Sequence, residues 1–170
     1  MQKTYRLIIV ALFGSIMAVT RLFVPSPIDK ILIAVDAILL ALSALFVKGV
    51  GATYVGAAGG TLTGLLRPSL IPYSIIYSIV YGVLVDVFMK VFNVKACSQG
   101  VNRNRLIYAM ACSTLIIGFI SYYATTLFPQ IITPSPMMDM MVAFFGPATG
   151  ATAGYATAYL WNKYLKSIPV

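Results

Sequence analysis

The sequence contains no histidine and no glutamate, and charged residues make up only 9% of its 170 positions. Histidine is the commonest general acid–base group in enzymes and the commonest metal ligand. The four carboxylates belong to Asp29, Asp36, Asp86 and Asp139, which are scattered singly along the chain. Because neither a His–carboxylate pair nor a pair of acids is available, we expect no catalytic site, no metal site and no cofactor. The sequence therefore predicts that this protein is not an enzyme.

Redox and nucleotide-binding motifs are also missing from the sequence. Cys97 and Cys112 are not spaced as a CxxC motif, which argues against a redox or metal-binding pair. No GxxxxGKS or GxxxxGKT loop occurs, so the chain does not bind ATP in the P-loop manner. The formal net charge is +8, but the basic residues lie between apolar runs rather than in one cluster. This distribution is typical of charges that orient a membrane protein and argues against nucleic-acid binding.

Apolar residues are what the sequence has in abundance. They make up 60% of its positions, and the mean hydropathy is +0.92. A soluble domain carries about 25% charged residues, and a chain of this length cannot bury so much apolar surface away from water. The apolar runs are continuous, whereas a membrane β-barrel shows short alternating segments. The sequence therefore predicts an all-α integral membrane protein embedded in the lipid bilayer.

Six apolar runs are separated by polar or proline-containing breaks, and at about 20 residues for each span the chain has room for all six. We predict one compact domain of six transmembrane helices at residues 5–24, 31–47, 50–66, 71–94, 106–128 and 139–161. Only Lys48-Gly49 separates the second run from the third. One continuous helix through this break would be about 50 Å long, which is too long for a hydrocarbon core of about 30 Å. We therefore expect a tight helical hairpin.

The distribution of Lys and Arg predicts the orientation of these helices. If the N-terminus is cytoplasmic, nine of the twelve basic residues lie inside, and only Arg21, Lys30 and Arg67 lie outside. This asymmetry is what the positive-inside rule expects. The sequence therefore predicts that both termini are cytoplasmic.

Small residues recur every four positions on three of the predicted helices. The longest stripes are Ala52/Gly56/Gly60/Gly64 and Gly146/Gly150/Gly154/Ala158. Such stripes let helix backbones approach closely in lipid, either inside one chain or against a partner. The first helix carries two shorter stripes, formed by Ala11 with Ser15 and by Gly14 with Ala18. We interpret these shorter stripes as the better candidates for contact with another membrane subunit.

Intramembrane carboxylates are candidates for function because burying a charge in lipid is costly. Asp36 lies about one turn inside the second helix. Its carboxylate either faces a cavity open to the outside or pairs with Arg21 or Lys30. Asp86 precedes Lys90 by four positions, a spacing that suits an ion pair within one helix. We interpret Asp86 as a structural, cap-like residue.

Aromatic and small polar residues complete the predicted ligand site. Tyr73 and Tyr77 offer flat rings with hydroxyls, which suit a planar heterocycle, or else belong to an interfacial aromatic belt. The Gly146-Pro147 pair is expected to interrupt the sixth helix and to free backbone groups to line a cavity. The candidates for ligand binding are thus Asp36, Arg67, Tyr73, Tyr77, Tyr122, Gly146 and Thr149.

The chain resembles a known transporter family over its whole length. The resemblance is carried by six short helices with cytoplasmic termini, and by the segments LIIVALFGSIMAV at 7–19, GAAGGTLTGLLRPS at 56–69 and YGVLVD at 81–86. These features resemble the substrate-binding S component of energy-coupling factor (ECF) transporters, the vitamin importers of bacteria and archaea. Ala11 and Ser15 resemble the AxxxA motif with which that family docks on a transmembrane coupling subunit, with Ser in the last place.

The resemblance implies a multi-pass subunit of the prokaryotic cell membrane. It would bind a vitamin-like heterocycle from outside, in the outer halves of helices four to six, and topple to release it inside. The implied partners are a transmembrane coupling subunit and two ATP-binding cassette subunits. The residues leave other functions open: a six-span scaffold of the cell-shape type, and a stand-alone channel or exporter. A small intramembrane enzyme is disfavoured by the missing acid–base partners.

Overall fold

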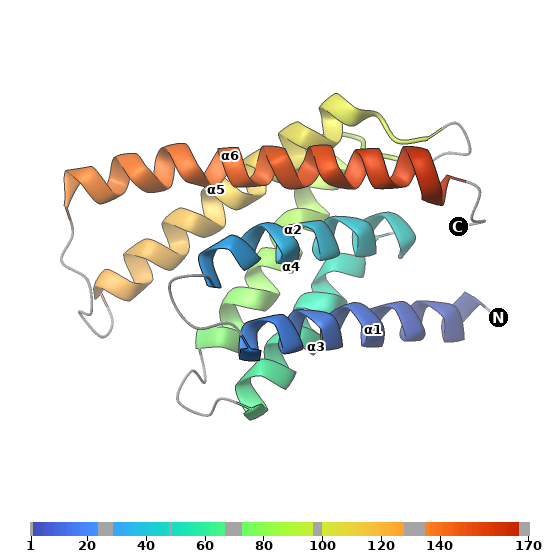
Figure 1. Ribbon diagram of the computed structural model, residues 1–170, viewed down its shortest axis with the longest axis horizontal. Coiled ribbons are helices and arrows are strands. Elements are labelled where there is room, and N and C mark those ends of the chain that lie inside the picture. Colours follow the sequence, from blue (N-terminus) through green and yellow to red (C-terminus); the bar gives the residue numbers. More distant parts are fainter. Residues whose placement is uncertain are drawn as a thin grey trace.

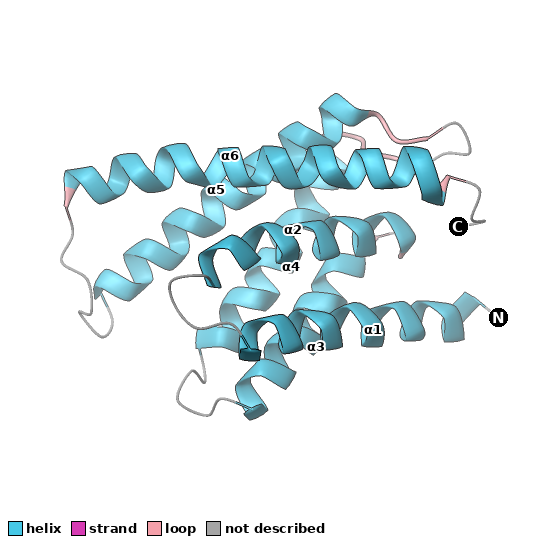
Figure 2. Cartoon of the chain, in the orientation of Figure 1, coloured by secondary structure: helices cyan, strands magenta, loops and turns pink. Residues whose placement is uncertain are grey.

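The computed structural model describes residues 2–23, 29–47, 49–66, 73–96, 100–127 and 135–166 of the protein. These residues form six α-helices and no β-strand (Figure 2). The helices are α1 (Gln2–Phe23), α2 (Asp29–Phe46), α3 (Gly51–Leu66), α4 (Tyr73–Val91), α5 (Arg103–Leu127) and α6 (Pro136–Leu160), and a π-helical turn, η2 (Trp161–Leu165), follows α6. The prediction of an all-helical fold with six helices is confirmed. Each helix begins and ends within three residues of its predicted range.

Successive helices run in opposite directions through the bundle (Figure 1). As a result, α1 begins and η2 ends at the same end of the molecule, which we call the terminal end. Helices α2 and α4 end there, and α3 and α5 begin there. The last turn of α1 and the first turn of α2 lie at the opposite end. The fold thus places the start of α1 and the end of η2 on one side, as the alternation of six helices requires.

Helix α2 is central and contacts each of the other five helices. In Figure 1 it lies between α1 and α6. Its side chains are apolar on nearly all faces, as expected for a helix surrounded by protein, and Ala37, Leu40 and Ala41 are fully buried. At the terminal end, Phe46 packs on Trp161 with ring centroids 4.9 Å apart. This contact fixes the end of α2 against the end of α6.

The turn between α2 and α3 confirms the predicted helical hairpin. Helix α2 ends at Phe46 and α3 begins at Gly51. Between them, Gly49 has a φ of 109°, a backbone conformation that residues with a side chain rarely adopt. The glycine therefore allows the chain to reverse within a few residues instead of continuing as one long helix.

The two long small-residue stripes pack inside the chain. Helix α3 packs mainly on α4, and α5 packs mainly on α6. A methyl group added at Gly60 would lie 2.8 Å from Cβ of Ser78 on α4, and one added at Gly154 would lie 2.9 Å from Cα of Ile107 on α5. Carbon atoms do not approach this closely, so glycine is needed at both positions. The stripes therefore form two tightly packed helix pairs and are not surfaces for a partner.

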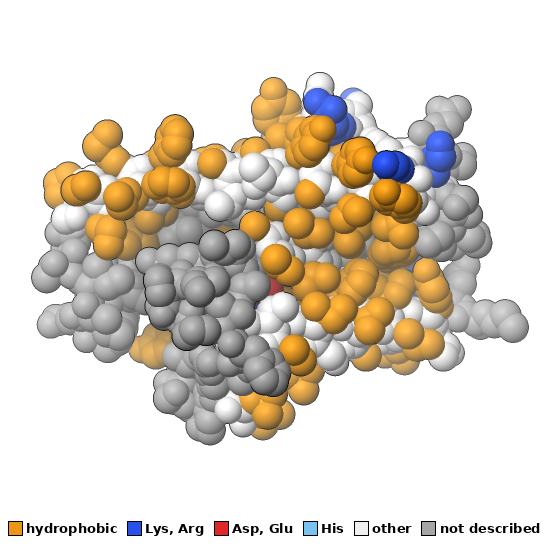
Figure 3. Space-filling view, viewed as in Figure 1, with side chains coloured by type: hydrophobic (Ala, Val, Ile, Leu, Met, Phe, Trp, Pro, Cys, Tyr) orange, Lys and Arg blue, Asp and Glu red, His pale blue; other side chains and the backbone are white. Residues whose placement is uncertain are grey.

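Three described segments are long and apolar enough to cross a membrane: Thr4–Arg21, Tyr73–Val91 and Arg103–Ala124. Helix α2 contributes a shorter apolar segment, Ile33–Phe46. Figure 3 shows apolar side chains over much of one face of the molecule. Large ones are widely exposed, for example Leu7 at 69% and Phe144 at 73%. Apolar surface of this extent is unusual for a soluble monomer, and the helices are compatible with a membrane location.

Candidate functional site

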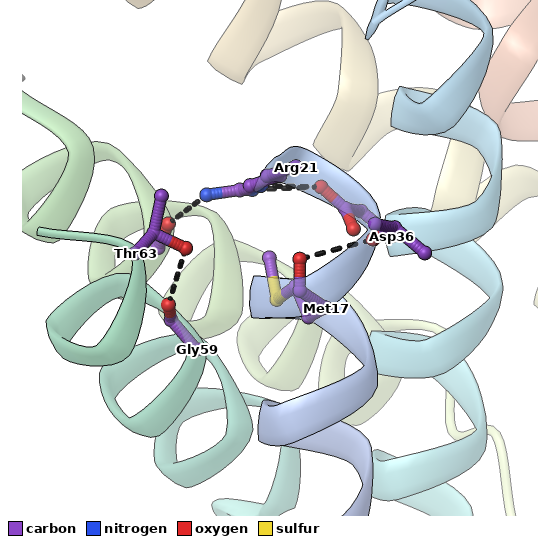
Figure 4. Close-up of polar contacts among 7 residues, drawn as sticks. Met17, Arg21, Asp36, Gly59 and Thr63 are labelled. Carbon is purple, nitrogen blue, oxygen red and sulfur yellow. Dashed lines mark hydrogen bonds and ion pairs between the residues drawn. The ribbon is translucent and has the colours of Figure 1, made fainter. Parts of the chain in front are cut away.

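Charged and hydroxyl side chains from three helices meet near the end of the bundle opposite the terminal end (Figure 4). Arg21 lies in the last turn of α1. Its Nε and Nη2 atoms each lie 2.8 Å from Oδ2 of Asp36 on α2. Its Nη1 atom donates a hydrogen bond of 2.7 Å to Oγ of Ser78 on α4. One guanidinium group thus joins three helices, and we call Arg21, Asp36 and Ser78 the polar cluster.

Asp36 is ion-paired, which was one of the two interpretations of its sequence position. Its partner is Arg21; the side chain of Lys30, the other possible partner, lies outside the described residues. The side chain of Asp36 is only 5% exposed and that of Arg21 is 26% exposed. Charges removed from water are tolerated only when they are paired and hydrogen-bonded. Removal of either partner would therefore leave a buried charge without compensation.

Three oxygen atoms in this region have hydrogen-bonding capacity that the described residues do not use. Oδ1 of Asp36 and the hydroxyls of Tyr81 and Ser74 are buried without a hydrogen-bond partner among those residues. Tyr81 interacts electrostatically with both Arg21 and Asp36, and Ser74 lies one turn before Ser78 on α4. A buried polar atom without a partner costs about 1–3 kcal/mol. A ligand that bonds to these atoms would recover that free energy.

Helix α3 closes one side of the polar cluster. Gly60 of α3 packs against Ser78, and Thr63, labelled in Figure 4, lies about one turn further along α3. The Thr63 side chain is buried, and its hydroxyl donates a hydrogen bond of 2.7 Å to the carbonyl of Gly59. The hydroxyl proton is thus used within α3, while the oxygen can still accept a bond.

The predicted tyrosines of α4 stand on the helix that carries Ser78. Tyr73 is exposed and Tyr77 is half-buried. Their rings are stacked, with centroids 6.2 Å apart. Tyr81, at the depth of the cluster, follows Tyr77 by one helical turn. Helix α4 therefore carries a pair of stacked rings toward its start and buried hydroxyls deeper in the bundle.

The other predicted ligand residues that the structure describes do not belong to the cluster. The hydroxyl of Tyr122 accepts a hydrogen bond of 3.2 Å from the backbone nitrogen of Ser135, which holds the start of α6. The hydroxyl of Thr149 donates to the carbonyl of Gly146, 2.8 Å away in the same helix. Gly146 itself packs against α5. Arg67 lies outside the described residues.

The predicted interruption of the sixth helix is wrong. Helix α6 is continuous from Pro136 to Leu160 and includes Pro147 in its interior. A proline removes one backbone hydrogen bond and crowds the preceding turn, but the flanking turns of α6 are held by extensive packing on α5. Within α6, the backbone therefore does not break to line a cavity.

Asp86 caps the start of α3 from the neighbouring helix α4. Its Oδ1 accepts a hydrogen bond of 3.2 Å from the backbone nitrogen of Ala52. Its Oδ2 accepts bonds from the backbone nitrogen and the hydroxyl of Thr53, at 2.8 and 2.6 Å. The carboxylate satisfies amides that no carbonyl of α3 can reach. Asp86 is thus a cap, whereas its expected ion pair with Lys90 is not formed in the described part of the chain.

The four interface candidates on α1 divide between two faces. A methyl group added at Gly14 would lie 2.9 Å from Cβ of Ala58 on α3, and Ala18 is 2% exposed. These two residues are packed inside the chain and present no exposed surface on α1. Ala11 and Ser15 lie on the exposed face of the helix.

Sequence reasoning named Arg21 as one of two possible partners of Asp36 but did not include Ser78 among the candidates for ligand binding. A signal was present on α4, where Ser74, Ser78 and Tyr81 put polar groups on one face of an apolar helix.

Neither protein-family models, nor curated proteins, nor solved structures match this chain. The geometry of the polar cluster and the surface of α1 are therefore the basis on which a function can be proposed.

Arg21→Met should lower the free energy of unfolding by about 3–5 kcal/mol, because it leaves the Asp36 carboxylate buried without a counter-charge. The double variant Arg21→Met/Asp36→Leu should recover much of this loss. Thermal unfolding of the purified proteins in one detergent measures both effects. If the effects of the two single substitutions simply add in the double variant, the ion pair does not couple α1 to α2.

Proposed function

We propose that this protein is the substrate-binding membrane subunit of an ECF-type importer. It captures a vitamin-like heterocycle from outside the cell and delivers it through a transmembrane coupling subunit, with energy from two ATP-binding cassette subunits. The observation that carries the proposal is the buried Asp36 carboxylate, which has one oxygen on Arg21 and one that no described residue bonds to. Ionisable groups at membrane depth usually mark a path or a site for a substrate.

In this proposal all six helices cross the bilayer of a prokaryotic cell, and the terminal end faces the cytoplasm. The shortest helix, α3, has 16 residues and is about 24 Å long, a mismatch that a bilayer accommodates by thinning locally. Arg21 stands at the opposite end. The basic residues described at the terminal end are Arg6, Lys90, Lys95, Arg103, Arg105, Lys163 and Lys166. The positive-inside rule favours this orientation, which turns the polar cluster toward the outside.

The groups around the cluster limit the chemistry of the ligand. Oδ1 of an ionised Asp36 can only accept a hydrogen bond, so the ligand has to present an N–H or O–H group. The hydroxyls of Tyr81 and Ser74 can donate or accept. The stacked rings of Tyr73 and Tyr77 offer a flat apolar surface to a planar ring. An amino- or amide-bearing heterocycle meets these requirements.

The exposed face of α1 is the proposed contact with the coupling subunit. Ala11 and Ser15 lie on this face among large exposed side chains, including Leu7 at 69%, Ile8 at 59% and Leu12 at 54%. Small residues at four-residue spacing let a partner helix approach the α1 backbone. Because the sequence has no P-loop, the energy for substrate release comes from the partner subunits.

Ala11→Leu should abolish co-purification of the tagged chain with coexpressed coupling and ATP-binding cassette subunits, because the larger side chain keeps the partner helix at a distance. The matched control is Ala148→Leu on α6, since Ala148 is also exposed; this variant should co-purify normally. Undiminished co-purification of Ala11→Leu would exclude this face of α1 from the interface.

Mass spectrometry of any small molecule released from the purified protein tests the proposed function. We expect a planar heterocycle with N–H groups. Tyr77→Ala should weaken its binding roughly two- to tenfold, as expected for an aromatic contact worth about 0.5–1.5 kcal/mol. Tyr54→Ala should leave binding unchanged, because Tyr54 is 56% exposed on α3. A protein that neither releases nor binds such a molecule would favour the scaffold function over the importer.

A further inference from the structure

A cavity of about 510 Å³ lies at the terminal end of the bundle, away from the polar cluster. It is bounded by the last turns of α2 and α4 and by the segment that follows α4. Its lining combines apolar side chains with amine and amide groups, and the residues that matter here are Ala44, Leu45, Met89, Lys90, Asn93 and Lys95. Nothing in the proposed import of a substrate from outside uses this cavity.

The end of α4 brings two lysines to the same cavity. Asn93 has a φ of 52°. Its backbone nitrogen donates to the carbonyl of Lys90 at 3.0 Å, and that of Val94 donates to the carbonyl of Met89 at 2.9 Å. These two bonds around a left-handed residue form a Schellman motif, which ends a helix and turns the chain aside. Lys95 therefore leaves the axis of α4, and both Lys90 and Lys95 line the cavity.

The acid that lines this cavity offsets only part of its positive charge. Asp86 belongs to the lining, but both of its oxygens accept hydrogen bonds from Ala52 and Thr53 at the start of α3. Among the described residues, neither Lys90 nor Lys95 forms an ion pair with a carboxylate. The lining thus carries two ammonium groups and one carboxylate, so its net charge is positive. A cavity of this charge favours an anion.

We propose that this cavity binds the phosphate of an anionic membrane lipid, with the ammonium groups of Lys90 and Lys95 paired to the phosphate. Leu45 and Met89 contact the glycerol and the first acyl carbons, a contact that a free phosphate ion would not use. Basic pockets between helices on the cytoplasmic side of a membrane commonly bind anionic headgroups. The inference rests on the proposed membrane placement of the terminal end and not on the identity of the imported substrate.

Native mass spectrometry of the purified full chain tests this site, with phosphatidylglycerol or phosphatidylcholine added to separate samples. The wild type should retain more phosphatidylglycerol than phosphatidylcholine. Lys90→Gln and Lys95→Gln should each weaken this binding roughly fivefold. Lys163→Gln removes the same charge at the same end of the bundle. Because Lys163 lies over the rings of Tyr159 and Tyr164 and does not line the cavity, this control should bind the lipid normally.

Equal retention of the two lipids, or an equal loss in Lys163→Gln, would overturn the proposal. A third sample contains inorganic phosphate at the same concentration as the lipid. If phosphate alone binds as tightly as phosphatidylglycerol, the ligand is a free anion and the lipid site is wrong. Since lipid retention is measured without any imported substrate, failure here and failure of the importer function are seen in different experiments.

Discussion

A guanidinium group and a carboxylate buried together in an apolar bundle constrain the rest of this structure. Arg21 and Asp36 join α1 to α2, and the bond from Arg21 to Ser78 adds α4. Because an unpaired charge is very costly in such an interior, α1 and α4 are held in one position relative to the central helix α2. The same contacts fix Oδ1 of Asp36 in place, and none of the described residues bonds to it. A binding site needs such a fixed acceptor that a ligand can reach.

Close helix packing is what brings these groups within reach of each other. Ser78, which the guanidinium group contacts, lies against the glycine stripe of α3, and a methyl group at Gly56 or Gly60 would collide with it. Helix α6 packs on α5 through its own glycine stripe, where a methyl group at Gly150 or Gly154 would collide with α5. In lipid, apolar contact alone does not drive helices together, so small residues and interhelical polar bonds account for much of their association. The proposed site and the stability of the bundle therefore depend on overlapping sets of residues.

The positions of the helices could be predicted because they depend on local pattern: continuous apolar runs, and breaks at glycine or proline. The rotation of each helix about its own axis could not be predicted. Ala11/Ser15 and Gly14/Ala18 have the same spacing, yet only the second pair is buried, with Gly14 against α3. The pairing of Asp36 was foreseeable, because a buried charge needs a counter-charge. The role of the Thr149 hydroxyl was not foreseeable. A threonine that bonds within its own helix looks the same in sequence as one that binds a ligand.

The most direct test of ligand binding at the polar cluster is calorimetric titration of Asp36→Asn with the molecule released from the wild type. The amide keeps the shape of the side chain but removes its charge. We predict a loss of affinity of tenfold or more, because hydrogen bonds to a charged group contribute about 1.5–3 kcal/mol. An unfolding midpoint measured on the same sample shows that the variant is folded. Unchanged affinity in folded Asp36→Asn would contradict binding at this site.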